Sequence, residues 1–418
     1  MRIAMIHTPL LGRGGAHRQI LSLTIELQKA GNEVEIFTNA VNEETCYPEL
    51  LKQVTVNVVP NPLIPFRYNS SSSNSSSKEV HGISNVRMWL QRIVRSAPFY
   101  TSELPSMLSL GRTIPKGFDI INNHNFPTEW AAFIAKKRLR VPVVWMCNEP
   151  PFWFFAWKRR KVRKIYWPLF GVLDKVAVKY IDEIVALSHI AAGHVKKAYN
   201  RSARVVRSGV DIDLFHNASG KDVRRKHDLE NDFVLLQVGN IDPVRRQSDS
   251  IMALYCLSRN YDNVKLILDG GGRAGPREEL TRLSENLGVK DKVLFWHTKS
   301  DEELARVYAA CDVFVFPSQI TWGLAVTEAM AAGKPVIVSK NCGASEIIQS
   351  GVNGIIVDHA KPKEIGEQAE LLMNNPKSRK KLGEHAYEYV KSNLSWEKYA
   401  KNMESVFQRA IVSFRRNL

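Results

Sequence analysis

The sequence predicts an α/β protein built from two successive doubly wound parallel sheets. Short apolar, β-branched runs alternate with helical stretches along the chain, which is the pattern of strands buried on both faces. The alternation stops and restarts near Ser208-Gly209-Val210-Asp211. The length of 418 residues also exceeds what one hydrophobic core usually supports. We therefore expect domains at 1–207 and 208–395, with a helix at 396–418 that returns to the first domain.

The first domain is expected to hold six buried strands, each a short apolar run. These runs are Ile3–Ile6, Val34–Phe37, Val54–Val59, Ile120–Ile121, Val141–Trp145 and Ile184–Leu187. Between them, Gln19–Ala30 and Glu129–Lys137 have the spacing of amphipathic helices.

The second domain repeats the alternation and ends in a long helical stretch. The expected strands are Phe233–Val238, Val264–Leu268, Val293–Phe295, Val313–Phe316 and Val336–Val338. Helices are expected at about 247–259, 276–287, 301–310 and 324–332, and residues 377–416 are helical without a strand signal.

The composition restricts the compartment and the partners. The formal net charge of +16 calls for an anionic partner: nucleic acid, anionic lipid or a phosphate-bearing substrate. Five scattered cysteines show no paired spacing, which favours a reducing compartment. Neither a signal peptide nor a membrane-spanning apolar run is apparent. We expect a cytoplasmic protein with at most peripheral contact to the membrane.

Ligands of open α/β sheets bind beyond the carboxyl ends of the strands, so the loops that follow strands carry the chemistry. The loop after the first strand contains Gly14 and Gly15, which would let the backbone approach a phosphate or would merely make a tight turn. The loop after Val238 contains Asn240, Arg245 and Arg246. The two arginines suit a diphosphate, and the alternative is a solvated pair.

The segment Phe316–Ile337 is the most informative part of the chain. It reads as a strand, a loop, a helix of small residues that opens at Gly323, and a Gly-Lys-Pro turn into another strand. Glu328 lies on an otherwise apolar helix face, where a carboxylate needs a partner. That partner is either a pair of sugar hydroxyls or a structural donor within the protein.

This segment closely resembles the signature of retaining family-4 glycosyltransferases, which have the GT-B fold of two facing Rossmann-like domains. Matching motifs occur in order along the chain, at Gly14-Gly15-Ala16, Asp119–His124, Ser208–Asp211, Leu268–Gly272, Pro317-Ser318 and Gly351–Gly354. The first domain looks most like that of mannosyltransferases that build lipid-linked oligosaccharides. The resemblance implies a nucleotide-sugar donor, such as GDP-mannose or a UDP-sugar. No metal or other cofactor is expected, because arginines and helix termini can neutralise a leaving diphosphate.

The resemblance also implies roles for individual residues. Arg245 or Arg246 would bind the diphosphate, and Glu328 would bind the nucleotide ribose. Backbone N–H groups of Trp322, Gly323 and Leu324 would meet the diphosphate or the donor sugar. The loop Phe295–Thr298, with His297, lies where the family holds the base.

Three departures from the family pattern concern catalysis. Asn240 stands where the family has an arginine, Ile320 where it has a glutamate, and Asn148 where it has a histidine. Asn148 can hydrogen-bond a sugar but cannot act as a base. In a front-face reaction the leaving diphosphate can take the acceptor proton, and Glu149 and His124 are the remaining acid–base candidates. A non-catalytic protein that binds a nucleotide sugar is the alternative.

The segment Pro150–Trp167 combines seven aromatic residues with six basic ones. Aromatic side chains prefer the membrane interface and basic ones attract anionic headgroups. This segment is therefore predicted to dock on an anionic membrane, where a lipid-linked acceptor would lie, and the alternative is a core helix with one basic face. Nucleic acid is not expected as a partner, because the motifs in the rest of the chain indicate a sugar-donor site.

Overall fold

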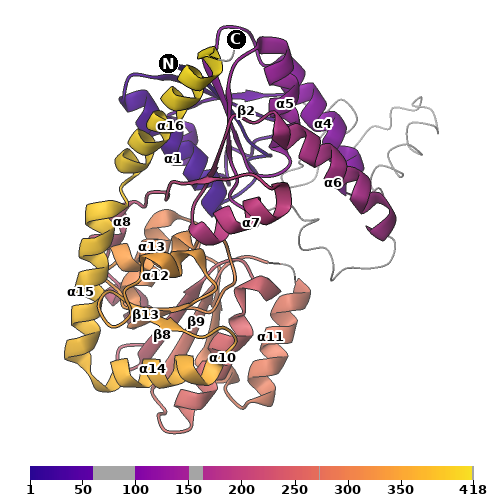
Figure 1. Ribbon diagram of the computed structural model, residues 1–418. Coiled ribbons are helices and arrows are strands. Elements are labelled where there is room, and N and C mark those ends of the chain that lie inside the picture. The colour runs from indigo at the N-terminus through magenta and orange to yellow at the C-terminus, as the bar shows by residue number, and fades with distance from the viewer. Residues whose placement is uncertain (60–98, 150–162, 273, 417–418) are drawn as a thin grey trace, which may run out of the picture. The chain divides into compact units, whose positions relative to one another are not determined.

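The structure is a computed structural model that describes residues 1–59, 99–149, 163–272 and 274–416. The chain forms two compact units (Figure 1). Unit 1 comprises Met1–Val185, His194–Arg204 and Ala400–Leu418, and unit 2 comprises Ala186–Gly193 and Val205–Tyr399.

The first sheet has seven strands in the order β3-β2-β1-β4-β5-β6-β7. Its strands are β1 (Arg2–Ile6), β2 (Glu33–Thr38), β3 (Thr55–Val58), β4 (Ile120–His124), β5 (Val143–Met146), β6 (Glu183–Ala186) and β7 (Arg204–Val205). The pairings from β3 through β6 are parallel, with Ile3 opposite both Val34 and Ile120. The accompanying helices are α1 (Gly15–Lys29), α2 (Pro48–Leu51), α4 (Phe99–Thr113), α5 (Thr128–Leu139), α6 (Arg163–Lys179) and α7 (His189–Tyr199).

The second sheet has six parallel strands in the order β10-β9-β8-β11-β12-β13. They are β8 (Phe233–Val238), β9 (Val264–Asp269), β10 (Val293–Trp296), β11 (Val313–Phe316), β12 (Val336–Ser339) and β13 (Ile355–Val357). The α-helices are α8 (Ile212–His216), α9 (Lys221–Lys226), α10 (Gln247–Ser258), α11 (Ala274–Asn286), α12 (Asp301–Ala310), α13 (Leu324–Ala331), α14 (Pro362–Asn374) and α15 (Pro376–Asn393). Short 3₁₀ turns include η2 (Pro243–Arg245), η3 (Lys290–Lys292) and η4 (Gly343–Ile347).

The prediction of two doubly wound parallel sheets is confirmed. Each sheet is covered by an apolar core that includes the expected strands, with Ile121 and Val143 in one and Leu235 and Val315 in the other. Strand order reverses between β1 and β4 in the first sheet and between β8 and β11 in the second. A crevice forms beyond the carboxyl ends of the strands at such a reversal, and there this architecture binds ligands.

The helical stretch predicted at 377–416 consists of two helices, and the second begins at 396, where the C-terminal helix was predicted to start. Helix α15 ends at Asn393, and α16 (Trp396–Arg416) begins after Leu394 and Ser395. The Ser395 hydroxyl caps the new helix by accepting a hydrogen bond from the Lys398 N–H at 3.1 Å. From Ala400 onward, α16 belongs to unit 1, where Glu404 accepts a hydrogen bond from Asn32 at 3.1 Å.

Gly111 sets how closely α4 approaches α5. A Cβ at this position would lie 2.4 Å from the Ala131 carbonyl oxygen and 2.9 Å from Ile134 Cβ. Gly111→Ala should therefore destabilise the protein by about 1–3 kcal/mol through overpacking. Gly193→Ala in α7, where nothing lies within 4 Å, should instead gain about 0.5–1 kcal/mol from helix propensity. Urea denaturation measures both, and equal effects of the two substitutions would contradict this packing.

Candidate functional site

The loops after β8 and β9 come together at the strand-order reversal of the second sheet because both begin with glycine. Gly239 and Gly270 have φ values of +146° and +159°. A Cβ on Gly270 would lie 2.2 Å from the Gly239 carbonyl oxygen, so only glycine permits this approach. The backbones at the carboxyl ends of β8 and β9 are therefore in direct contact.

The Arg245 side chain lies beside Gly239. A Cβ on Gly239 would be 3.8–3.9 Å from the Cδ, Nε and Cζ atoms of Arg245. The main chain of Arg245 is fixed, because its carbonyl accepts hydrogen bonds from the side chains of Gln237 at 2.8 Å and Ser318 at 3.1 Å. Within the described chain its guanidinium forms neither a hydrogen bond nor an ion pair. It is a positioned cation that retains all its donors.

Arg246 is arranged differently from its neighbour. Its Nε and Nη2 donate to the carboxylate of Asp249 at 2.6 and 2.8 Å, and Asp249 is only 3% exposed. A bidentate pair of this kind offsets the charge of the guanidinium. The sequence left the choice between the two arginines open, and the geometry favours Arg245 as the one available to an anionic ligand.

The start of α13 faces the same edge of the sheet. Gly323 precedes the helix with φ of +158°, and a Cβ there would lie 3.2 Å from Cys342 Sγ and 3.3 Å from Ala344 Cβ. Trp322 is buried, and its carbonyl accepts a hydrogen bond from Cys342 Sγ at 2.8 Å. Burial raises the pKa of the Cys342 thiol to about 12, and the nearby Arg245 charge partly opposes the rise. Arg245 and the turn into α13, with Leu324 as its first residue, therefore share one region.

Glu328 lies one turn further along α13 and is 6% exposed. Tyr308 Oη donates to its Oε2 at 2.9 Å and also lies 3.1 Å from the Ala325 carbonyl oxygen. Burial, and next the Glu328 charge, raise the pKa of Tyr308 well above its usual value, so the phenol remains a donor. A structural partner for the carboxylate thus exists, and it is a tyrosine.

The loops after β8, β9 and β10 meet around Gly271. A Cβ on Gly271 would lie 3.0 Å from His297 Cε1 and 3.7 Å from Asn240 Oδ1. The loop after β10 is held by Asp269, which accepts hydrogen bonds from the N–H and hydroxyl of Thr298 at 3.0 and 2.9 Å. The structure thus brings His297 and Asn240 together. A cavity of about 450 Å³ adjoins this loop, lined in part by the rings of Trp296 and His227.

A second polar cluster lies in unit 1, at the carboxyl ends of β1 and β4. His7 is fully buried, with Nδ1 2.7 Å from the Thr8 carbonyl oxygen and Nε2 3.1 Å from Asn125 Nδ2. These partners indicate that the imidazole of His7 is neutral, with Nδ1 as the donor and Nε2 as the acceptor. Burial lowers the pKa of His7 well below its usual value, which agrees with the neutral form. Asn148 joins the cluster by donating from Nδ2 to Asn125 at 2.8 Å and to Gln19 at 2.7 Å.

The other two acid–base candidates are placed very differently. His124 is fully buried as the last residue of β4, and its Nε2 lies 2.8 Å from Asn122 Oδ1. Burial lowers its pKa to about 3. An enclosed neutral imidazole cannot exchange protons with an acceptor, which argues against His124 as the catalytic acid or base. Glu149 is exposed.

The sequence reasoning missed His17, which lies in the first turn of α1. Its Nδ1 lies 2.6 Å from the Gly12 carbonyl oxygen, and its ring meets that of His7 edge to face at 5.2 Å. Burial lowers its pKa as well. Gly14 precedes the helix in an extended conformation, and Gly15 is exposed. The available signal was the spacing: His7 ends the first apolar run and His17 follows the glycines of the same loop.

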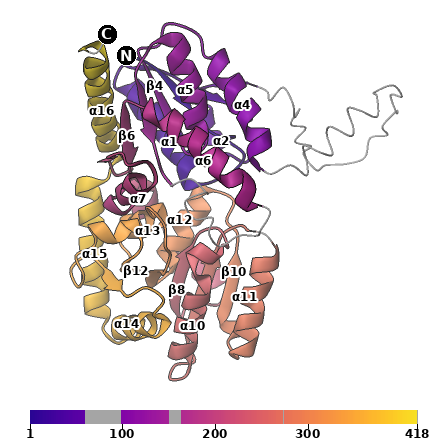
Figure 2. The ribbon, with the colours of Figure 1, turned by 45° about the vertical axis from the view of Figure 1, so that its right-hand side comes forward.

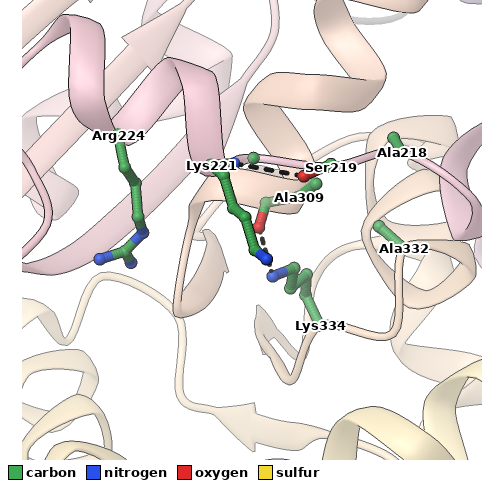
Figure 3. Close-up of a pocket in the computed structure, with 8 residues that line it drawn as sticks. Ala218, Ser219, Lys221, Arg224, Ala309, Ala332 and Lys334 are labelled. Carbon is green, nitrogen blue, oxygen red and sulfur yellow. Dashed lines mark hydrogen bonds between the residues drawn. The ribbon is translucent and has the colours of Figure 1, made fainter.

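A cavity of about 400 Å³ in unit 2 is lined by Lys221, Arg224 and Lys334 (Figure 3). Lys334 donates to the carbonyls of Ala309 and Cys311 at 2.7 and 2.9 Å, and Arg224 donates to that of Ala310 at 2.8 Å. These two cations therefore stabilise the C-terminal end of α12. No group of three or more metal-ligating side chains occurs among the described residues.

Two family models together match most of the chain. Residues 13–214 match the model of Glycosyltransferase Family 4, and residues 220–389 match that of Glycosyl transferases group 1. A D-inositol 3-phosphate glycosyltransferase of Corynebacterium glutamicum (strain R) is 24% identical over 99% of this chain and 98% of its own. Spore coat protein SA of Bacillus subtilis (strain 168) is 26% identical over 65% of this chain and 80% of its own.

Solved structures share the fold at low sequence identity. Anabaena Alr3699/HepE in complex with UDP-glucose has a TM-score of 0.74 at 18% identity, covering 98% of this chain and all of its own. Sucrose-phosphate synthase of Thermosynechococcus elongatus has a TM-score of 0.75 at 17% identity, covering 99% of both chains. The two sheets are those of the GT-B architecture. The chain carries the two domains of a group 1, family-4-type glycosyltransferase.

The burial of His124 predicts a specific acid sensitivity. Its pKa is about 3 when folded and about 6.5 when unfolded, so below pH 6.5 the unfolded chain binds the proton first and stability falls. At pH 5 this one group should cost about 2 kcal/mol relative to pH 7. Chemical denaturation of the wild type and of His124→Gln at both pH values isolates the effect, because the variant should lose less stability. Equal losses in the two proteins would show that His124 titrates normally.

Proposed function

We propose that this glycosyltransferase moves a hexose from a nucleotide sugar to a glycan acceptor with retention of the anomeric configuration. The observation that carries the proposal is the Arg245 guanidinium, which has no hydrogen bond or ion pair within the described chain and lies beside Gly239 and the turn into α13. Helix N-termini and guanidinium groups both favour a diphosphate. A nucleotide-sugar donor is further supported by the fold neighbour that was solved with UDP-glucose.

In the proposed reaction the donor's anomeric C–O bond breaks toward the diphosphate, and the acceptor oxygen bonds to the same face of the sugar. The acceptor proton passes to an oxygen of the departing diphosphate. Arg245 and the N–H groups at the start of α13 offset the charge that develops on this leaving group, which is where preorganised electrostatics contribute most. Glu328 and the loop of His297 would hold the ribose and the base.

Unit 1 would bind the acceptor with the polar cluster at the carboxyl ends of β1 and β4. Asn148 suits this role as a hydrogen-bonding group that its neighbours Gln19 and Asn125 hold in place. We propose a lipid-linked or membrane-proximal glycan as the acceptor, with mannose as the favoured sugar, at the cytoplasmic face of a membrane. The predicted docking segment Pro150–Trp167 falls largely outside the described residues. No helix that the structure describes is long and apolar enough to cross a membrane.

The competing function is nucleotide-sugar binding without transfer. It is motivated by Ile320 and Asn148, which replace two polar residues of the family pattern. A thermal-shift screen of UDP-, GDP- and ADP-sugars first identifies the donor, because a ligand stabilises the state that binds it. Single-turnover assays with the labelled donor then separate the two functions, since release of nucleotide with transfer or hydrolysis of the sugar requires catalysis. Binding without any turnover would favour the competing function.

The two neighbouring arginines provide a matched pair of variants. Arg245→Ala should weaken nucleotide binding at least tenfold, because a charge-assisted hydrogen bond contributes about 1.5–3 kcal/mol. Arg246→Ala should change the affinity less than threefold but lower the melting temperature, because it leaves the buried Asp249 without its ion pair. Calorimetric titration with the nucleotide measures both affinities. The assignment fails if Arg245→Ala, correctly folded, binds like the wild type.

Glu328→Gln tests the ribose contact. The amide keeps the shape and an acceptor for Tyr308 but lacks the charge, so nucleotide affinity should fall about tenfold with little change in the apo melting temperature. Tyr308→Phe is the control, because it removes the structural partner and should lower stability by about 1 kcal/mol while nucleotide affinity changes little. A strongly destabilised Glu328→Gln with normal affinity would assign the carboxylate a purely structural role.

A further inference from the structure

Helix α6 carries apolar side chains on both of its faces. Gly171, Asp174, Ala177 and Val178 form the face that is buried in unit 1. The opposite face presents Val172, Leu173 and Val176, which are 58%, 40% and 41% exposed. Tyr180, which directly follows the last residue of the helix, is 39% exposed. A helix on the surface of a globular protein normally places polar residues on this side. An exposed apolar stripe therefore calls for a partner.

The exposed charged side chains that the structure describes on α5 and α6 are all basic. Lys175 and Lys179 lie on the outward side of α6, and Lys137, Arg138 and Arg140 are exposed on and just after the neighbouring α5. Figure 2 shows α5 and α6 beside each other, and Phe133 meets Tyr180 with ring centroids 4.9 Å apart. Lys137 Nζ lies 4.0 Å from the centroid of the Tyr180 ring, which joins the cations to the apolar stripe.

The acidic residues of these helices are turned inward. The two helices contain one acidic residue each, Glu129 in α5 and Asp174 in α6, and both are fully buried. Asp174 accepts a hydrogen bond from Tyr199 Oη at 2.7 Å. Burial, and next the neighbouring Asp174 charge, raise the pKa of Glu129 well above its usual value. The acidic side chains of the two helices therefore lie inside unit 1, whereas Lys137, Lys175 and Lys179 are exposed.

We propose that this α5–α6 surface, defined by Val172, Leu173, Val176, Tyr180 and the surrounding cations, docks on an anionic lipid surface. This rests on the proposed function, in which the acceptor is membrane-proximal. Aliphatic side chains flanked by lysines match an interfacial helix that buries its apolar side in the headgroup region. A lipid surface accounts for the uniform charge better than a protein partner, which would ordinarily meet a mixed surface.

Vesicle flotation of the full chain tests the proposal. The wild type should bind vesicles of phosphatidylglycerol and phosphatidylcholine at low salt and bind pure phosphatidylcholine vesicles much less. Val172→Glu combined with Val176→Glu should lower the partition coefficient at least tenfold. Lys175→Glu combined with Lys179→Glu should lower it by a similar factor and flatten its salt dependence. Leu371→Glu in α14 is the matched control, since Leu371 is 61% exposed but lies outside this surface, and should bind like the wild type.

Nucleotide-sugar stabilisation, measured on the same proteins, separates this proposal from the proposed function. Both α6 variants should keep the donor response and the melting curve of the wild type, which shows that they fold. The docking proposal would be overturned if the α6 variants bound vesicles as well as the wild type does. It would also be overturned if the wild type did not bind anionic vesicles, even if it bound a protein partner. A wild type that binds vesicles but responds to no nucleotide sugar would overturn the proposed function alone.

Discussion

The site in unit 2 depends on one constraint, the close approach of the backbones that leave β8 and β9. The Gly239 carbonyl and Gly270 are so near that no side chain fits at Gly270, and a Cβ at Gly239 would contact Arg245. Because the parallel strands end at the same edge, this contact fixes where the loops after β8, β9 and β10 can go. Arg245, the turn into α13 and the Gly271 neighbourhood are arranged around it. The charged group is thus placed by backbone packing rather than by an ion pair.

Much of the fold was predictable because strands buried on both faces leave a clear apolar signal. Phe233–Val238 and Val313–Phe316 were predicted with the bounds that the structure has. β13 and β7 were missed, since runs of three and two residues carry too little pattern. The polar strand β4 was predicted only for Ile120–Ile121, because Asn122, Asn123 and His124 do not read as buried. These polar side chains can be buried because they form hydrogen bonds inside the protein. Asn122, for example, donates to the Val144 carbonyl at 2.9 Å.

The same limit explains what the sequence could say about the site. Which loops carry ligand-binding groups followed from their position after strands. Whether each of these groups is free to bind a ligand could not be predicted from the sequence, because it depends on hydrogen-bond and ion-pair partners from other parts of the chain. The Arg246–Asp249 pair was readable in part, being three residues apart at a helix start, but the unpaired state of Arg245 required coordinates. The strand that ends in His124 was predicted to end at Ile121, three residues too early, so the burial of His124 was not foreseen.

The basic residues of the two units have different roles. In unit 2, Lys334 and Arg224 donate to backbone carbonyls at the end of α12 and Arg246 pairs with Asp249, whereas the Arg245 guanidinium has no such partner within the described chain. In unit 1, α5 and α6 bury Glu129 and Asp174 and leave Lys137, Lys175 and Lys179 exposed. A strongly basic chain can therefore hold a confined diphosphate site and a broad anionic surface with separate sets of residues.

Amide hydrogen exchange with and without the nucleotide sugar tests the central claim most directly, because it reports where the donor binds. Binding at the strand-order reversal of unit 2 should slow exchange at Gly239 and Asn240, in the first turn of α13 and at His297–Lys299, and leave α14 and α15 unchanged. Saturating donor that protects only segments outside this edge, or protects none, would contradict the account.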